Sequence, residues 1–333
     1  MTTPAIPEYR DRRTGLVIFG IFEMLIGLFC ACIIPLMMIA QTIASRRPGA
    51  PAAPPPMGMI FIIYGLLAVA FIWVGVGSML ARRWARAIVL CASAVTLCGG
   101  LIAAVLMPFF LPHLGEIMAR TSPTALPPGA ILGAKIGVMV VIFLIFILIP
   151  GSLFLFYRSP HVKRTCEVRD PVERWTDRCP LPVLAFSLMK AFGGISMVGM
   201  AFSLHVYPLF GLFVSGVAGA ALMALVGLLI LWVALGMYRL RLCAWWAALG
   251  LQAILLISNL ITFWRGGMEA YYLKAGFDPR MAHSSGQMFA QPTVRWMVVI
   301  PTFFAVAWLL WIRRYFLAPI PAAAPDNGSQ AGS

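Results

Sequence analysis

The sequence predicts an all-α, polytopic membrane protein with eight transmembrane helices, arranged as two parallel four-helix repeats. Composition is the first observation: 61% of the 333 residues are apolar and 11% are charged, whereas soluble domains average roughly 45–50% and 25%. The apolar residues also fall into eight runs of about 20 or more, the length that a helix needs to cross a bilayer. The third observation is that the two halves of the chain share one loop plan.

The first half predicts a polar N-terminal segment, 1–14, and a four-helix repeat, 15–158. Its first apolar run is much longer than the roughly 7–15 residues of a signal peptide's core, so we expect it to be retained. Residues 45–56 are rich in proline, so we expect them to form an extended link. A basic turn is expected at 81–86 and a proline-containing loop at 112–129. The expected spans are 16–43, 57–80, 87–111 and 130–156.

The densest run of charge, 157–182, separates the two apolar halves. We interpret 159–181 as a cytoplasmic linker with a short interfacial helix, and 182–316 as the second repeat. Its first two spans are expected to be joined by a very short link and its last two by a long polar loop, 265–295. The tail, 317–333, is rich in Pro, Ala, Gly and Ser and is predicted to be disordered. The expected spans are 183–206, 209–238, 244–264 and 296–316.

Basic residues predict the orientation. If the N-terminus is inside the cell, the inner segments hold 16 Lys and Arg residues and the outer segments hold 7. An excess of Lys and Arg in short cytoplasmic loops is the strongest topological signal in membrane proteins. We therefore expect a multi-pass protein of the cell membrane with both termini in the cytoplasm. The free-looking cysteines fit a bacterial inner membrane.

Recurring segments predict the duplication. The apolar four-mer that begins at Met139 recurs at Met297, and Gly77, which precedes the basic turn, matches Gly236. The offsets, 158 and 159, agree. Four helices per unit would relate the repeats by an axis along the membrane normal.

Glu23 and Lys190 are the candidate intramembrane site. In the repeat alignment they occupy equivalent positions, and Glu23 lies about 15 Å beyond Arg13 along the helix, near the expected bilayer centre. A buried ionisable residue needs a partner or a water-filled cavity, so the two side chains could form an ion pair or a transport site. Alternatively, Glu23 bonds a hydroxyl or is protonated, and Lys190 snorkels to the interface.

The linker contains the second candidate site. Asp170-Pro171-Val172-Glu173 reads as a helix start, with Asp as the cap and Pro in the first turn. Val172, Trp175 and Cys179 would then share one face of a helix on the inner membrane surface. The functional alternative is a docking site for a cytoplasmic protein, formed by Val172, Arg174, Trp175 and Arg178.

Motifs for catalysis and metal binding are weak. No phosphate loop, hydrolase elbow or zinc-protease motif occurs, so we expect neither an enzyme nor a cofactor. Cys166, Cys179 and His161 match no zinc spacing, and reduced thiols are the favoured interpretation. A metal shared by His113, His205 and His283 is a remote alternative. The net charge is +14. The basic residues that give this charge flank the apolar runs, which indicates a lipid bilayer as the partner and argues against nucleic acid.

Two classes of function remain. One is a non-enzymatic membrane scaffold or interaction protein. The other is a small-molecule or ion carrier with a site between the repeats, near Glu23 and Lys190. A polar cavity would favour the carrier, whereas a solid apolar interface between the halves would favour the scaffold. The sequence does not define the oligomeric state.

Overall fold

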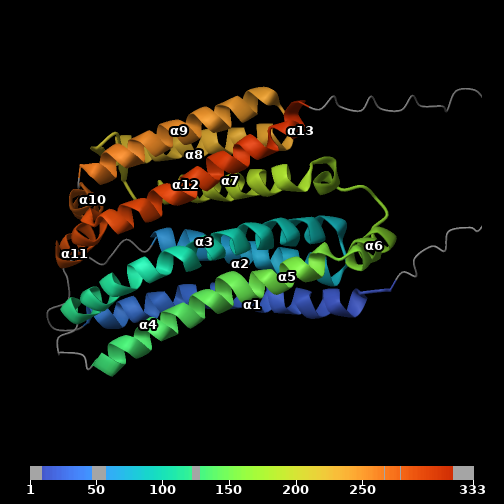
Figure 1. Cartoon of the computed structure of the whole chain (residues 1–333), viewed down its shortest axis with the longest axis horizontal. Coiled ribbons are helices and arrows are strands. Elements are labelled where there is room, and N and C mark those ends of the chain that lie inside the picture. Colours follow the sequence, from blue (N-terminus) through green and yellow to red (C-terminus); the bar gives the residue numbers. More distant parts are fainter. Residues whose placement is uncertain (1–9, 47–57, 122–127, 266, 278, 318–333) are drawn as a thin grey trace, which may run out of the picture.

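The structure is a computed structural model that describes residues 10–46, 58–121, 128–265, 267–277 and 279–317. Within these ranges, eight helices are long and apolar enough to cross a membrane. This confirms the predicted all-α, polytopic class. Figure 1 shows the helices running nearly side by side in two adjacent groups, with the start of α1 and the end of α13 at the same end of the bundle.

The first group contains four spans. Its fourth span is continuous but changes from α to π geometry and back, because the segments α4, η1 and α5 follow one another without a break. The elements are α1 (Arg13–Ser45), α2 (Gly58–Met79), α3 (Arg83–Thr121), α4 (Pro128–Phe143), η1 (Leu144–Leu148) and α5 (Ile149–Arg158).

The second group also contains four spans, and two short helical elements connect it to the first. The connecting elements are α6 (Pro160–Arg169) and η2 (Trp175–Arg178). The spans and their adjoining elements are α7 (Leu181–Met200), β1 (Val206–Leu209), β2 (Leu212–Ser215), α8 (Gly216–Tyr238), α9 (Leu242–Trp264), α10 (Met268–Lys274), α11 (Pro279–Ala290), α12 (Pro292–Ile312) and α13 (Arg314–Leu317).

The closest helix pairs are α1 with α2 and α7 with α8. Gly20 lies against Gly75 in the first pair, and Gly194 lies against Gly227 in the second. Glycines let helix backbones approach closely where lipid provides no hydrophobic driving force. The same pairing order in both groups supports the predicted duplication, which stays a prediction.

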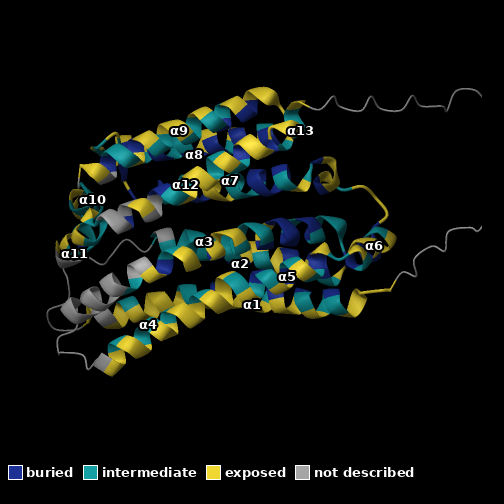
Figure 2. Cartoon of the chain, viewed as in Figure 1, coloured by how far each residue is buried: buried dark blue, intermediate teal, exposed yellow. Residues whose placement is uncertain are grey.

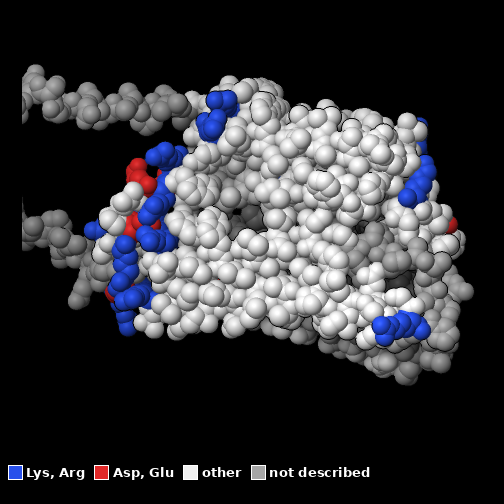
Figure 3. Space-filling model, turned by 180° about the vertical axis from the view of Figure 1, so that it is seen from behind, with Lys and Arg blue, Asp and Glu red and all other residues white. Residues whose placement is uncertain are grey.

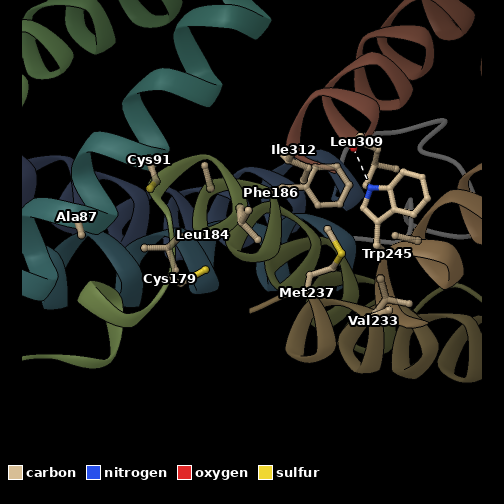
Figure 4. Packing of buried hydrophobic residues seen from close by; sticks show 14 residues of the cluster. Ala87, Cys91, Cys179, Leu184, Phe186, Val233, Met237, Trp245, Leu309 and Ile312 are labelled. Carbon is tan, nitrogen blue, oxygen red and sulfur yellow. Dashed lines mark hydrogen bonds between the residues drawn. The ribbon is translucent and has the colours of Figure 1, made fainter. Parts of the chain in front are cut away.

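The two groups meet in an apolar core. Ala87 and Cys91 of α3 pack against α7 residues such as Leu184 and Phe186. Trp245 closes the far side of this core, and its Nε1–H donates to the Leu309 carbonyl at 2.8 Å (Figure 4). Apolar side chains therefore fill this part of the boundary between the two groups.

Large apolar side chains cover the outside of the bundle. Val69, Val105 and Leu155 are each about 70% exposed. Figure 2 shows such exposed positions along the outward sides of α1, α4 and α9. A surface of this kind is stable in contact with lipid rather than water.

The connections differ most from the prediction. The expected short link between α7 and α8 is an antiparallel hairpin in which Val206 pairs with Ser215. Its turn is made by Phe210 and Gly211, both with positive φ, as tight hairpins require. The expected loop 265–295 contains α10, α11 and the start of α12, and α3 runs ten residues past its predicted end. Four predicted segments lie partly outside the described residues. The parts concerned are 47–56 of the extended link 45–56, 1–9 of the N-terminal segment, 122–127 of the loop 112–129 and 318–333 of the tail.

Candidate functional site

Glu23 is a deeply buried acidic residue of the first group. Its side chain is 1% exposed and accepts a hydrogen bond at Oε2 from Ser78 Oγ, at 2.8 Å. Ser78 in turn accepts one from the Tyr157 hydroxyl at 2.9 Å. The other carboxylate oxygen, Oε1, has no hydrogen-bond partner. Residues from α1, α2 and α5 thus converge on one enclosed polar cluster.

Glu23 lies nearer the end of the bundle than its sequence position predicted. Gly20, one turn earlier, already contacts Met79, the last residue of α2. Tyr157 is the penultimate residue of α5. The carboxylate is therefore only one or two turns from the ends of α2 and α5, at about 5.4 Å per turn. The start of α1 extends about two turns past the end of α2, whereas Gly15 near that start lies against Phe156 near the end of α5.

Lys190 belongs to a separate polar contact in the second group. Its Nζ donates to Gln252 Oε1 on α9 at 2.6 Å and lies 5.3 Å from the centroid of the Phe186 ring. Gln252 is ten residues into α9, so this contact lies deeper than the Glu23 cluster. The amide oxygen and the ring face both stabilise a cation away from water.

The expected ion pair between Glu23 and Lys190 is absent from the salt bridges of the described residues. Each side chain has its partners within its own group, Ser78 for Glu23 and Gln252 for Lys190. The pairing hypothesis was wrong because α2 and α3, rather than α1, contact α7. The alternative, a hydroxyl partner for Glu23, fits the geometry.

The helix in the linker begins earlier in the chain than predicted. Asp170 does not begin a helix; it follows the end of α6, which starts with Pro160 in its first turn. Only a single 3₁₀ turn, η2, forms after it. Val172 and Trp175 are exposed while Cys179 is buried, so they do not share one face. The helix start at Asp170 was wrong because its carboxylate binds arginine side chains and the Arg83 N–H at the start of α3, rather than N–H groups that follow it in the linker.

Asp170 is the anchor of the linker. It is 2% exposed and accepts hydrogen bonds from Arg174, through Nε at 3.0 Å and Nη2 at 2.5 Å. The Arg83 backbone N–H donates to it at 3.3 Å, and Arg82 Nη1 lies at 3.5 Å. These bonds, first that of Arg174, lower the pKa of the Asp170 carboxyl. The linker is therefore locked onto the turn between α2 and α3.

A second set of contacts joins the linker to both groups. Arg83 Nε pairs with Asp177 at 3.2 Å, and the same carboxylate accepts the Arg174 backbone N–H at 2.9 Å. The Tyr238 hydroxyl at the end of α8 donates to the Trp175 carbonyl at 2.9 Å. The linker is thus a rigid platform between the groups. Two docking candidates, Arg174 and Trp175, take part in the hydrogen bonds that hold it in place.

Charges gather at the end of the bundle that carries α6. Figure 3 shows Lys, Arg, Asp and Glu crowded there, with an almost uncharged surface along the helices. Val172 is 62% exposed on this platform, and Arg178 is exposed as well. Figure 1 places α6 at the tip of the bundle, beyond the end of α5.

The linker thiols are buried and protonated. Burial raises the pKa of Cys166 to about 11 and that of Cys179 to about 12. A thiol must be deprotonated to bind a metal or attack a substrate. Among the described residues, no three His, Cys, Asp or Glu side chains are grouped to hold a metal ion. His283 instead contacts Glu269 at 3.1 Å, and the side chain of His113 is not described.

No family model, curated protein or solved structure matches this chain. The site must therefore be interpreted from its own residues. Sequence reasoning missed Ser78, Tyr157 and Gln252, since uncharged polar residues in apolar runs carry little signal. It also missed the role of Arg82 and Arg83, although their place in a short basic turn beside an acidic linker was a usable clue.

Proposed function

We propose that this is a non-enzymatic interaction protein of the cell membrane, whose central linker binds a cytoplasmic protein. In this proposal both termini are cytoplasmic and the membrane is a bacterial inner membrane, as the distribution of basic residues favours. The observation that carries the proposal is the anchoring of Asp170. A linker that only joined two repeats would not need a buried carboxylate held by arginines on both sides.

The platform offers a rigid surface for a partner. Val168 and Val172 are 58% and 62% exposed beside basic side chains, and Arg178 has no ion-pair partner among the described residues. Exposed apolar groups ringed by charges are typical of protein interfaces, and a preorganised surface loses little entropy on binding. We expect a partner segment with apolar and acidic residues.

Site-specific photocrosslinking in native membranes tests this proposal. A benzoylphenylalanine at Val172 should give one discrete protein adduct, and Arg178→Glu should abolish it by charge reversal. The matched control is a benzoylphenylalanine at Val69, which is 70% exposed and lies midway along α2, and which should crosslink only to lipid. Lipid adducts alone at Val172, or an adduct unaffected by Arg178→Glu, would argue against the proposal.

The unpaired oxygen of Glu23 favours a second candidate, an ion or proton carrier. A buried carboxylate with a free acceptor atom is a common element of ion pathways. The cluster is enclosed within the first group, so such a site would not lie between the repeats. Labelling a Glu23→Cys variant with a membrane-impermeant maleimide distinguishes the classes: reaction supports a water-filled path, and protection supports the interaction protein.

A further inference from the structure

A small basic cavity lies beside the linker, outside the surface used in the proposed function. Its volume is about 350 Å³, and its lining comes from three separate parts of the chain: the start of α1, the turn between α2 and α3, and the end of α6. The lining residues are Arg13, Met79, Leu80, Ala81, Arg82 and Arg169.

The cavity contains positive charge that the described residues do not fully neutralise. Arg169 pairs with Asp11 at 3.1 Å. Arg82 has only a loose contact with Asp170, whose carboxylate is already held twice by Arg174. Among the described residues, the Arg13 side chain has no carboxylate partner at all. The three arginines thus exceed the two nearby carboxylates by one charge.

The cavity also lies at the ends of candidate membrane spans, since spans begin at Arg13 and Arg83 and another ends at Met79. Met79 ends α2, and Leu80, the next residue, is 58% exposed. One wall is therefore apolar and continuous with the lipid-facing surface, whereas the other is made of guanidinium groups. This is the boundary at which lipid phosphates lie, and basic pockets between helices at this depth recognise anionic headgroups. Arginine matches a phosphate with two parallel hydrogen bonds.

We propose that this cavity binds the phosphate of an anionic phospholipid, with Arg13 and Arg82 on the phosphate and Leu80 against the first part of the acyl chains. A free phosphate ion shares the headgroup's chemistry but would make no use of the apolar wall. The second half provides a natural control. Arg241 follows α8 as Arg82 follows α2, but the repeat alignment places Pro180 where the first half has Arg13.

The experiment measures lipid binding to the purified full-length chain in detergent, by native mass spectrometry and by thermal unfolding. Phosphatidylglycerol should bind and raise Tm, whereas phosphatidylcholine should do neither at the same concentration. Arg13→Gln should weaken phosphatidylglycerol binding about ten-fold, the worth of one charged hydrogen bond. Arg241→Gln should leave it unchanged. Arg13→Gln removes no ion pair between described residues, and an unchanged Tm without lipid would show that its loss of binding is not a folding defect.

Three results would overturn the proposal. One is equal binding of the two lipids, and another is equal loss of binding in Arg13→Gln and Arg241→Gln, since both indicate general attraction to lipid. The third is inorganic phosphate that reproduces the full rise in Tm and displaces the lipid at equal concentration, which would make this a site for a free anion. Arg13→Lys should bind phosphatidylglycerol more weakly than the original protein but more tightly than Arg13→Gln, and that result would support a phosphate contact.

Discussion

Ala81 and Leu240 both have a left-handed backbone, with φ of 52° and 54°, and each follows the end of a helix, α2 and α8 respectively. In both turns the following arginine donates its N–H to the carbonyl of a glycine five residues earlier. The bonds are Arg82 to Gly77 at 2.9 Å and Arg241 to Gly236 at 3.0 Å. This is the Schellman termination, which usually has glycine in the left-handed position. Two non-glycine examples 159 residues apart match the offset that predicted the duplication and support it.

A glycine at the left-handed position should stabilise the protein. A side chain in this conformation costs roughly 1 kcal/mol relative to glycine, so we expect Ala81→Gly to raise the free energy of unfolding by up to about that amount. The control is Ala70→Gly, in the middle of α2 on its exposed side, where glycine gains nothing. Thermal unfolding in detergent gives the comparison; a lower Tm for Ala81→Gly would mean that its methyl group matters more than its backbone.

Two adjacent glycines should respond very differently to alanine. A Cβ on Gly194 would lie 2.9 Å from the carbonyl oxygen of Gly227, which real structures do not tolerate, whereas a Cβ on Gly193 meets nothing within 4 Å. Gly194→Ala should therefore force α7 and α8 apart and cost about 1–3 kcal/mol. Gly193→Ala, measured in the same unfolding assay, should be nearly neutral. Equal effects would contradict the close packing of these helices.

The long elements were predictable because one property decides them. A run of about 20 apolar residues leaves the backbone no hydrogen-bond partners except its own in lipid, so all eight spans follow from composition and length. The linker was not predictable in this way. Asp170 satisfies the local rule for a helix start, but two arginines 87 and 88 residues earlier in the chain bind its carboxylate. Tertiary contact thus overrode local propensity.

The candidate site was predicted in part. Glu23 and Lys190 stand out because a charge in an apolar run is costly, and both are indeed held by polar partners. Their partners could not be found, since serine, tyrosine and glutamine are unremarkable in a membrane helix. The false pairing came from equating aligned positions with spatial contact. Equivalent helices of two repeats are related by an axis, and nothing requires them to touch.

Acid should loosen the linker before it unfolds the spans. Because the pKa of Asp170 is lowered in the folded protein, its contribution to stability is complete above its unfolded pKa, about 3.9. This contribution is lost as the pH falls through the lower, folded value. Asp170→Asn should remove it at neutral pH, at a cost of about 1–3 kcal/mol for the charged hydrogen bonds, and should flatten the dependence of Tm on pH below about 4.

The exposed Asp11 provides the comparison for that experiment. It also pairs with an arginine, Arg169, but its side chain is 46% exposed, so solvent screens the interaction. Asp11→Asn should change Tm little at any pH. A steep loss of Tm below pH 4 that persists in Asp170→Asn would assign the acid sensitivity to other carboxyl groups.

Double-mutant cycles at Glu23 should separate its true partner from its supposed one. Ser78 donates directly to Glu23, so Glu23→Gln and Ser78→Ala should interact, with a coupling energy of roughly 0.5–3 kcal/mol, the range for contacting residues. Glu23→Gln and Lys190→Met should instead be additive, since each residue has its own hydrogen-bond partner. Lys190→Met and Gln252→Leu should couple in turn, because they leave no unpaired polar group when combined.

The measurement is thermal or denaturant unfolding of the purified variants in one detergent. Full-length protein is required because Tyr157, from the end of α5, completes the hydrogen-bonded chain to Ser78 at 2.9 Å. A Tyr157→Phe variant removes that hydroxyl while it preserves packing, and should weaken the Glu23–Ser78 coupling, since the bonds of a buried chain polarise one another. Strong coupling between Glu23 and Lys190 would instead mean that the two groups approach each other in another state of the protein. That outcome would favour the carrier, because it requires the apolar core between the groups to open.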